Sequence, residues 1–441
     1  MSVKDQQGLE YSGASPAAVA RYERAVAAYH CYCGQPFPDL KAALADSPQF
    51  VMAHVLIAYM TLVGSNEGLR AMGAGAYAAL RDLPKNNREA GHAAAVGHLL
   101  AGEIRAAARA LEDVAIACPC DILALQVGQT MDFLRGDARM LRDRIGRALP
   151  AWTPDMPGYH AILGLHAFGL EETALYDRAE AAGREAVALE PRNNWARHAV
   201  AHVLEMQDRR AEGVRFMRDD AAAWTDGSFF LVHNWWHTAL FHLGLDEIGA
   251  VLDLYDGPIW GEPSDFAFDM ADAAALLWRL KLRDVDVDDR WAALARGWEA
   301  HRLGHNAFED AHAVMTFVAA GRDGDAEAAV DEIARIAAGV GDNAAATRDV
   351  GLPVAQAFLA YGRGQHRRAV DLLRDVRSIA HRFGGSHAQR DVLDLTLIDA
   401  ARRLGDAALE RALVAERKAA LPVVHRRPRG SVALGARAGA H

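Results

Sequence analysis

Two pairs of histidines that recur at a fixed distance constrain the fold of this chain more than any other feature. His198 and His202 lie four residues apart, and His233 and His237 repeat that spacing 35 residues later. Almost every other segment shows apolar residues at intervals of three and four, the period of an amphipathic helix, and no segment alternates as a half-buried strand does. The helical runs end at Gly, Asp, Asn or Pro, which stop helices. The chain therefore predicts an all-helical protein built from repeated helical hairpins.

The length of the repeat indicates the type of array. A recurrence near 34 residues, with a helix-turn-helix in each unit, is typical of tetratricopeptide-like repeats. Most units lack the full consensus, so we expect degenerate hairpins stacked into a right-handed α-solenoid, in which each hairpin buries its apolar faces against its neighbours. We expect residues 1–50 to form an N-terminal capping segment, residues 51–420 the solenoid, and residues 421–441 a flexible basic tail.

The histidines concentrate on one set of helices. In such an array the first helix of each hairpin lines the concave surface and the second forms the outer wall. Spacing and turn residues place first helices near residues 50–64, 87–101, 121–135, 156–169, 193–207, 228–243, 266–281, 308–320, 346–362 and 385–403. Twelve of the 19 histidines fall on these segments: His54, His92, His98, His160, His166, His198, His202, His233, His237, His242, His312 and His387. Histidine has no intrinsic preference for such positions, so we expect a concave surface rich in imidazoles.

Composition argues against several classes of function. The net charge is -10 and no basic stripe is present, so we expect no nucleic-acid partner. No apolar run approaches the ~20 residues that span a bilayer, and the N-terminus lacks the apolar core of a signal peptide. We therefore expect a cytoplasmic protein without a membrane partner, and a homodimer stays open. The cysteines form two C-x-C pairs, Cys31/Cys33 and Cys118/Cys120, which differ from the C-x-x-C of zinc and redox sites.

The first histidine pair offers metal ligands. His198 and His202 bring two imidazoles to one helix face, and Glu205 adds a carboxylate three residues further on. This set could hold a divalent metal such as zinc, although Ala199 stands where the H-E-x-x-H pattern of metalloproteases needs Glu. The same residues also suit a polar binding surface or hydrogen-bonded packing, and all three interpretations stay open.

The second pair belongs to the stretch HNWWHTALFH, residues 233–242. His233, Asn234, Trp235 and Trp236 are candidates for binding a ligand, because a tryptophan in a cleft supplies a large apolar face and one N–H donor. The two tryptophans lie about 100 degrees apart on a helix. One should therefore face the core and the other the groove or its edge, and packing of both between hairpins is the alternative.

Two further segments combine residue types that are expensive to bury. Asp310 and His312 share one helical turn, and Ser386 is placed to cap a helix that carries His387, Gln389 and Arg390. A carboxylate beside a histidine tunes the pKa and fixes the tautomer for acid–base work, although a solvent-exposed salt bridge explains such a segment equally well. Weaker candidates are Glu171, Glu172, Asp269, Asp272 and Arg279. No Gly-rich phosphate loop or nucleophile elbow is present.

Several of these strings are similar to one known family. HAVAHVLEMQ (198–207), HNWWHTALFHL (233–243), DAH (310–312) and GGSHAQRD (384–391), in this order, resemble the tetratricopeptide repeat protein 38 family, and the resemblance covers about residues 20–420. It implies a superhelix of tetratricopeptide-like hairpins and no particular activity. Where the family often reads F-N-D-x-H, this chain has Glu309 in place of Asn, which puts a contact made by that amide in doubt.

Two hypotheses of different classes follow. The first is a binding module that takes a small organic ligand or a short peptide in a concave groove rich in His and Trp. Since peptide-binding arrays line their grooves with Asn, Lys and Arg, a small ligand is favoured. The second is an enzyme that uses the same cluster for acid–base or metal-assisted chemistry. The sequence names neither a cofactor nor a reaction.

Each hypothesis has its own residues. The candidates for catalysis are His202, His237, Asp310, His312, His387 and Arg390. The candidates for ligand binding are His198, Glu205, His233, Asn234, Trp235, Trp236 and Gln389. We expect the histidines to meet in space, and their convergence within the width of one ligand would favour an active site.

Overall fold

The computed structural model describes residues 3–64 and 67–420. Within them the protein is all-helical except for one antiparallel pair of short strands, β1 (Val3–Lys4) and β2 (Glu10–Tyr11). The predicted all-α class is confirmed, and the strand pair went unnoticed because two-residue strands are too short to show alternation. None of the described helices has both the length and the apolar character needed to cross a bilayer. The predicted basic tail, residues 421–441, lies outside the described residues.

The helices follow one another with short connections. Those up to Met206 are α1 (Pro16–Cys31), α2 (Pro36–Asp46), α3 (Val51–Leu62), α4 (Glu67–Leu80), α5 (Asn87–Leu100), α6 (Ile104–Ala117), α7 (Ile122–Leu134), α8 (Ala138–Ala148), η1 (Leu149–Ala151), α9 (Tyr159–Glu171), α10 (Tyr176–Leu189) and α11 (Asn194–Met206). The remainder are α12 (Arg210–Arg218), α13 (Ala221–Thr225), α14 (Leu231–Gly244), α15 (Ile248–Leu254), η2 (Tyr255–Ile259), α16 (Ala267–Lys281), α17 (Arg290–Glu299), α18 (Ala307–Ala319), α19 (Asp323–Ala337), α20 (Asp342–Ala346), η3 (Thr347–Gly351), α21 (Leu352–Gly362), α22 (His366–Val376), η4 (Arg377–Phe383), α23 (His387–Leu404) and α24 (Ala407–Ala420).

Each predicted first helix is a helix in the structure, with ends close to the predicted ones. They are α3, α5, α7, α9, α11, α14, α16, α18, α21 (continued backwards by η3) and α23. Polar caps explain the agreement at several N-termini. The side chains of Asn86, Asp121, Asn193 and Ser386 each accept a hydrogen bond from the backbone N–H three residues further on, which satisfies a donor that has no partner within the helix.

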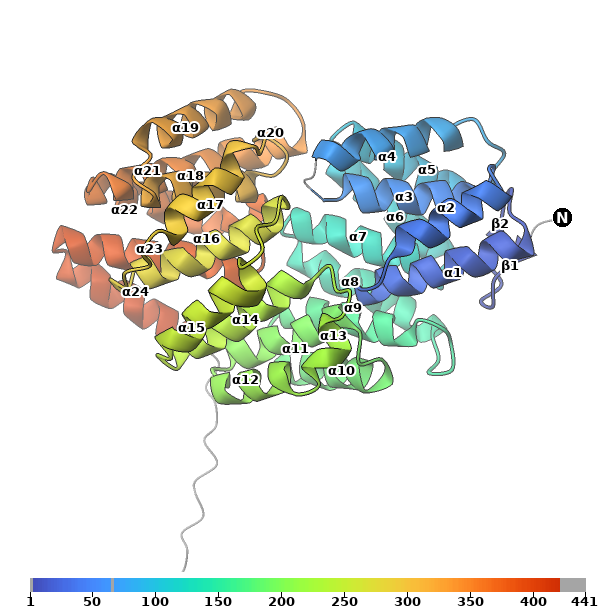
Figure 1. Cartoon of the computed structure of the whole chain (residues 1–441), viewed down its shortest axis with the longest axis horizontal. Helices are drawn as coiled ribbons and strands as arrows, with labels where there is room; N and C mark the ends of the chain where they lie inside the picture. The colour runs from blue at the N-terminus through green and yellow to red at the C-terminus, as the bar shows by residue number, and fades with distance from the viewer. Residues whose placement is uncertain (1–2, 65–66, 421–441) are drawn as a thin grey trace, which may run out of the picture.

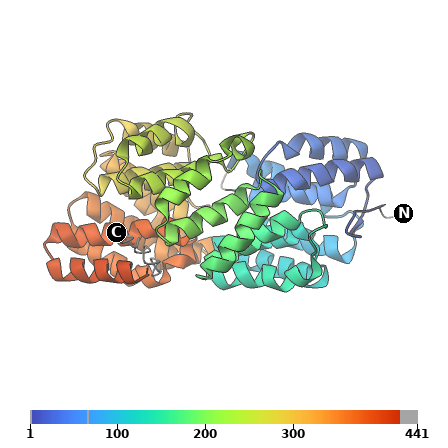
Figure 2. The same cartoon turned by 90° about the horizontal axis from the view of Figure 1, so that it is seen from below.

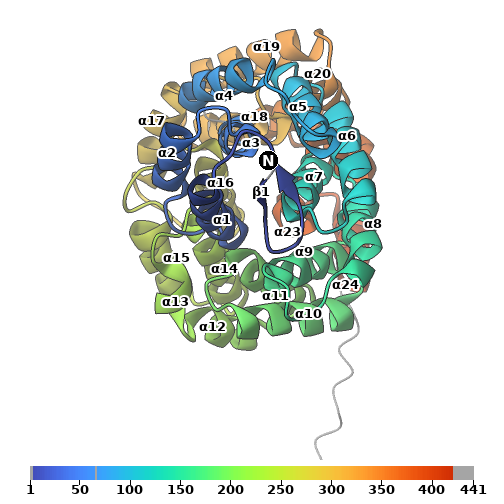
Figure 3. The same ribbon diagram turned by 90° about the vertical axis from the view of Figure 1, so that its right-hand side faces the viewer.

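The helices form an inner and an outer layer around a ring (Figure 3). The inner layer contains α3, α7, α9, α11, α14, α16, α18 and α23, and the outer layer contains helices such as α6, α8, α10, α12 and α19. Burial follows these layers. Every residue from Ala161 to Glu171 of α9 is buried, whereas only Ala179, Gly183 and Ala186 are buried in the adjoining outer helix α10. An inner helix is covered on all sides and an outer helix on one side only.

The helices make two turns around the axis of the ring, and the second turn stacks on the first along the long axis of the molecule (Figure 1). We call each of these turns a pass of the chain. Bonds between distant residues join the two passes. The backbone N–H of Gly34 donates to the carbonyl of Gly227 at 2.9 Å, and that of Arg105 donates to the carboxylate of Asp342 at 2.8 Å. The interior of the ring is therefore walled by helices from both passes.

The apolar core is divided near the middle of the chain. One large cluster of buried apolar residues runs from Tyr11 to Ala199, and the other begins at Trp236 and continues to Leu413. Helices α11 to α14, green in Figure 2, cross between the two halves. A patch of buried polar residues lies at this crossing, where α11 packs against α14.

Candidate functional site

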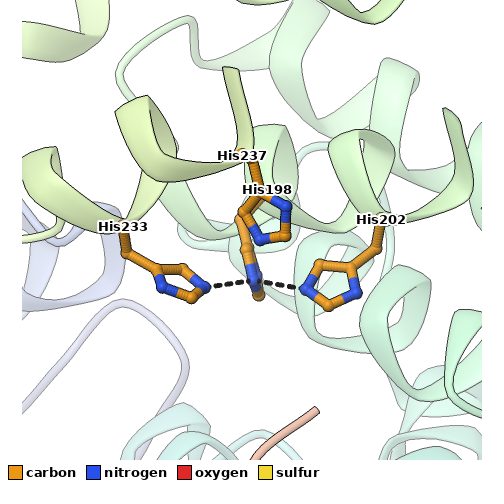
Figure 4. A group of neighbouring side chains, drawn as sticks. All are labelled: His198, His202, His233 and His237. Atoms are coloured by element: carbon orange, nitrogen blue, oxygen red, sulfur yellow. Dashed lines mark hydrogen bonds between the residues drawn. The ribbon is translucent and has the colours of Figure 1, made fainter. Parts of the chain in front are cut away.

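Four histidines from two neighbouring inner helices point at one another in the middle of the molecule (Figure 4). His198 and His202 lie one turn apart on α11, and His233 and His237 lie one turn apart on α14. Residues four apart share a helix face, and α11 packs against α14, so both pairs meet. We call these four residues the histidine cluster.

The imidazole nitrogens of the cluster are close together. Nε2 of His198 lies 2.8 Å from Nε2 of His202 and 3.0 Å from Nε2 of His233. The ring centroid of His237 lies 4.5 Å from that of His202 and 5.0 Å from that of His198. One nitrogen from each of the four rings lies within 4.8 Å of the chosen nitrogens of the other three.

The side chains of the cluster are buried, and burial determines their charge. All four side chains are buried, with His202 and His237 at 0% exposure. Burial lowers the pKa of His198, His202 and His237 well below the ordinary value, and the neighbouring imidazoles lower it further. These three rings are therefore neutral at pH 7 and each keeps one nitrogen lone pair.

A carboxylate on the next inner helix orients His233. Oδ2 of Asp272, on α16, lies 2.7 Å from Nδ1 of His233, and Asp272 itself is 1% exposed. The amide of Gln389 donates to the other oxygen at 3.3 Å. A proton on Nδ1 that points at this carboxylate leaves the lone pair of Nε2 facing the cluster.

A second charged group adjoins the cluster, and we call it the carboxylate–histidine group: Glu171, Glu172 and His387. Nε2 of His387, at the start of α23, lies 2.6 Å from Oε1 of Glu171, at the end of α9. The other oxygen of Glu171 lies 3.5 Å from Nδ1 of His202. Burial by itself would lower the pKa of His387, but Glu171 and Glu172 raise that pKa to about 9. Burial raises the pKa of Glu171, and His387 opposes that shift. His387 is thus an imidazolium at neutral pH, next to neutral imidazoles.

A large aromatic cavity reaches the cluster from the side of α1 and α2. Its volume is about 750 Å³, and His198 and His233 form part of its wall. Most of the wall is apolar, and its rings include Tyr29, Tyr32, Phe37, Trp195, Phe230 and Phe268. Among the described residues that line it, the ionisable groups apart from tyrosine and histidine are Asp269 and Glu309, and none is Lys or Arg. Burial raises the pKa of Asp269 to about 7, and a hydrogen bond from Ser264 opposes that shift.

No protein-family model matches this chain. The resemblance to the tetratricopeptide repeat protein 38 family, drawn from the four strings quoted above, therefore stays a prediction. What the site does must be argued from its own geometry.

Several predicted ligand-binding residues of the HNWW stretch are packing residues in the structure. Trp236 is fully buried and stacks on His233 at 5.4 Å, whereas Trp235 packs on Trp224 at 5.0 Å. Neither lines the aromatic cavity. Asn234 is buried and donates to the side-chain oxygen of Asn194 at 3.0 Å, which ties α14 to α11. His198, His233 and Gln389 do lie on the cavity wall.

Glu205 does not join His198 and His202 as the sequence predicted. Glu205 belongs to neither group of close metal-type ligands around His202 and faces a separate hollow lined by Arg210, Arg279 and Arg417. Burial raises the pKa of Glu205, and Arg210 opposes that shift. The second histidine pair, on α14, lies beside His198 and His202 instead.

The Asp310 and His312 segment is not part of the cluster. Asp310 accepts hydrogen bonds from the backbone N–H of Gly304 at 3.0 and 3.1 Å and so holds the loop before α18. Nδ1 of His312 donates to the carbonyl of Phe308 at 2.8 Å. Arg390 lies near the carboxylate–histidine group, 3.8 Å from Glu172, and donates to the carbonyl of Gly385. Of the catalytic candidates, His202, His237, His387 and Arg390 therefore converge, whereas Asp310 and His312 have other partners.

Sequence reasoning missed most of the cavity wall. Tyr29 and Tyr32 come from a segment predicted only to cap the array, and Phe230 lies directly before the HNWW helix. The run YHCYC, residues 29–33, was a visible clue because it crowds rings and thiols into one turn. Glu171 and Asp272 were weaker candidates, since their histidine partners are 31 and 39 residues away in the sequence or further.

Proposed function

We propose that this protein binds a small, largely apolar organic molecule in the aromatic cavity, with its polar end toward His198, His233 and Asp269. The observation that carries the proposal is the composition of the wall: aromatic rings on most sides and a few convergent polar groups at one end. A volume of about 750 Å³ lies within the range of ligand pockets, which also combine apolar walls with few polar groups.

The charges of the wall narrow the class of ligand. Asp269 and Glu309 are acidic, and the described wall residues include no Lys or Arg to pair with an anion. Aromatic faces attract cations. The ligand we propose is therefore neutral or carries one positive charge, such as an amine with an apolar body, and a carboxylate is disfavoured by repulsion.

The wider features of this proposal are those expected from the sequence. We propose a right-handed α-solenoid of degenerate tetratricopeptide-like hairpins, related to the tetratricopeptide repeat protein 38 family, that works in the cytoplasm without nucleic-acid or membrane partners. The alternation of inner and outer helices supports the repeat, and four free cysteines suit a reducing compartment. A short peptide is the alternative occupant, and a homodimer is compatible with it.

Three probes with one hydrocarbon body test the proposal: 4-phenylbutylamine, 4-phenylbutanol and 4-phenylbutyrate. Trp195, one of nine tryptophans in the chain, lies on the cavity wall, so a bound probe should change the total tryptophan fluorescence. We expect the amine and the alcohol to change this fluorescence and to raise the Tm, and the carboxylate to bind at least about tenfold more weakly, a difference of about 1.4 kcal/mol. Tightest binding of the carboxylate, or no response to any probe, would contradict the proposal.

Catalysis is the second candidate function, and one observation favours it. The imidazolium of His387 and the neutral ring of His202 have centroids 5.6 Å apart, so a group positioned as an acid adjoins one positioned as a base. Native mass spectrometry of the purified protein tests this candidate by identifying any molecule that the protein retains and following its conversion. A His202→Gln variant that retains the molecule without converting it supports catalysis, and equal conversion by the variant refutes a role for His202.

A further inference from the structure

The histidine cluster has too few N–H groups to form a hydrogen bond at each of its short nitrogen–nitrogen contacts. Nε2 of His198 faces two other Nε2 atoms, those of His202 at 2.8 Å and His233 at 3.0 Å. A neutral imidazole carries one N–H, so a proton on this nitrogen can serve only one of the two contacts. If the nitrogen carries no proton, it has a single lone pair, which cannot accept a full hydrogen bond from both neighbours.

His237 makes the deficit larger. Both of its ring nitrogens are buried without a hydrogen-bond partner among the described residues, and the side chain is 0% exposed. Nδ1 of His198 is likewise buried without a hydrogen-bond partner among the described residues. A buried polar group without a partner costs about 1–3 kcal/mol. Hydrogen bonds alone therefore leave this cluster under-satisfied in every protonation state.

We propose that the histidine cluster is a binding site for a divalent transition-metal ion such as Zn²⁺, ligated by one nitrogen each of His198, His202, His233 and His237. An ion at the centre accepts a lone pair from each inward nitrogen and needs none of the missing protons. Ligand nitrogens of a tetrahedral zinc site lie about 3.3 Å apart. The two shortest contacts, 2.8 and 3.0 Å, lie below that spacing, and the other chosen nitrogens lie within 4.8 Å of one another, so binding an ion requires small shifts of the rings in both directions.

The surrounding carboxylates fit the same site. Ligating histidines usually donate their other ring N–H to a carboxylate, which fixes the tautomer and orients the ring. Asp272 does this for His233 at 2.7 Å, and Glu171 lies 3.5 Å from the outer nitrogen of His202. Asp272 also offsets part of the charge of an ion held by four imidazoles, whereas the charge of Glu171 is already paired with His387. Imidazole ligands suit Zn²⁺ and related ions rather than Mg²⁺ or Ca²⁺.

The proposal does not depend on the proposed ligand. His198 and His233 lie both in the cluster and on the wall of the aromatic cavity, so the ion would sit at the polar end of that cavity. A bound ion would repel an ammonium group at this end, so the phenylbutyl probes are tested on chelator-treated protein and Zn²⁺ is tested on protein without a probe. Failure of the phenylbutyl probes to bind would therefore leave the metal site standing, and the reverse also holds.

Metal uptake by the full-length protein tests the site. Protein treated with a chelator and then given Zn²⁺ should retain one ion per chain after gel filtration, and the ion should raise the Tm. His237→Gln should abolish both effects, and Asp272→Asn should weaken binding about 10–100-fold. His242→Gln is the matched control: His242 lies on the same helix and is also buried, but it pairs with Glu247 outside the cluster. This variant should bind Zn²⁺ like the wild type.

Spectroscopy of the wild-type protein tests the metal site even if the variants do not fold. Zn²⁺ should shift the imidazole ¹⁵N resonances of the four cluster histidines, and bound Co²⁺ should give the intense visible absorption of four-coordinate geometry. The proposal is overturned if folded wild-type protein retains no Zn²⁺. It is also overturned if folded His237→Gln binds the ion as tightly as the wild type, which would place the ion at another group such as Cys31, His160 and Glu190.

Discussion

At the scale of single residues, the ion pair between His387 and Glu171 lies where the two passes of the chain meet. Glu171 is 0% exposed, and the rings of His387 and His202 are in contact. Removing one member of a buried pair leaves an uncompensated charge and costs about 3–5 kcal/mol. We expect His387→Gln to destabilise the protein by about 3 kcal/mol. This value is near the lower limit because the side chain of His387 keeps 24% exposure. The double variant with Glu171→Gln should recover most of the lost stability.

The pH dependence of this pair has a definite sign. The pKa of His387 in the folded protein, about 9, exceeds the ordinary histidine value of about 6.5 in the unfolded chain. The stabilisation is therefore fully present below about pH 6.5 and is lost as the pH rises through about 9. Urea unfolding of the wild type and the double variant should show their difference shrinking from pH 7 to pH 10. A difference that grows over this range would refute the assignment.

Asp269 supplies a second prediction at this scale. Burial raises its pKa to about 7, and an ammonium group binds the ionised carboxylate better than the neutral acid. The affinity for 4-phenylbutylamine should therefore rise about tenfold between pH 6 and pH 8, whereas that for the uncharged alcohol should stay constant. Asp269→Asn should remove the pH dependence, and Asp113→Asn, an exposed control beside Arg109, should keep it. Equal pH profiles for wild type and Asp269→Asn would exclude this role.

Single residues also show what the sequence could predict of the site. The spacing of His198, His202, His233 and His237 predicts two pairs on two helix faces, because local helix geometry decides it. The choice of Asp272 and Glu171 as partners depends on packing between separate helices, which no local pattern encodes. Trp236 looked like a ligand contact, but its ring stacks on His233 and has the guanidinium of Arg279 over it at 5.4 Å.

At the scale of elements, the start of α23 connects the cavity wall to the carboxylate–histidine group. Ser386 caps this helix in a capping box with Gln389. In this first turn the backbone N–H of His387 donates to Glu172 at 3.1 Å, and the amide of Gln389 donates to Asp272 at 3.3 Å. Ser386→Ala should cost about 1 kcal/mol. It should also lower the pKa of His387, read by NMR titration, since a frayed first turn moves the ring away from Glu171.

A second N-cap serine provides the control for that prediction. Ser15 caps α1 by accepting a hydrogen bond from the N–H of Ala18, far from His387 along the chain. Ser15→Ala should cause a similar loss of stability and leave the titration of His387 unchanged. If both variants shift that titration equally, the cap of α23 has no specific part in holding His387.

Helix positions were the most predictable level of structure. Caps such as Asn193 and turn residues are local, so the predicted first helices agree with the observed ones within a few residues. The π-helical turn η3 and the break within η2 were not predicted. In η2, Gly257 has a non-helical backbone (φ -99°, ψ -108°) directly before Pro258.

At the scale of the whole molecule, the site exists because the ring brings its two passes together. Hydrogen bonds span 215 residues between His387 and Glu172 and 237 residues between Arg105 and Asp342. The sequence predicts hairpins, but the number of hairpins in one turn follows from a small rotation at each step. Errors in that rotation accumulate along the chain. The expectation that the histidines meet in space had for this reason no local basis, and the contact of Glu171 on α9 with His387 on α23 was not predicted. The hairpins, by contrast, follow from local signals in the sequence.

The contact between the passes leads to a prediction about the whole ring. Gly136 has a φ of +65°, and a Cβ placed on it would lie 1.7 Å from the carbonyl oxygen of His381 on the other pass. Gly102 has a similar φ of +74°, but nothing lies within 4 Å of its Cβ position. Both Gly→Ala changes should cost about 1–3 kcal/mol through backbone strain, and only Gly136→Ala should also push the passes apart.

Small-angle scattering and probe binding separate these two glycines. Gly136→Ala should increase the radius of gyration. It should also weaken the binding of 4-phenylbutanol, because the cavity wall includes Tyr32 from one pass and Gln389 from the other. Gly102→Ala should keep the dimensions and the affinity of the wild type despite its loss of stability. If the two variants bind the probe equally well, closure between the passes does not form the cavity, and the first pass alone must supply it.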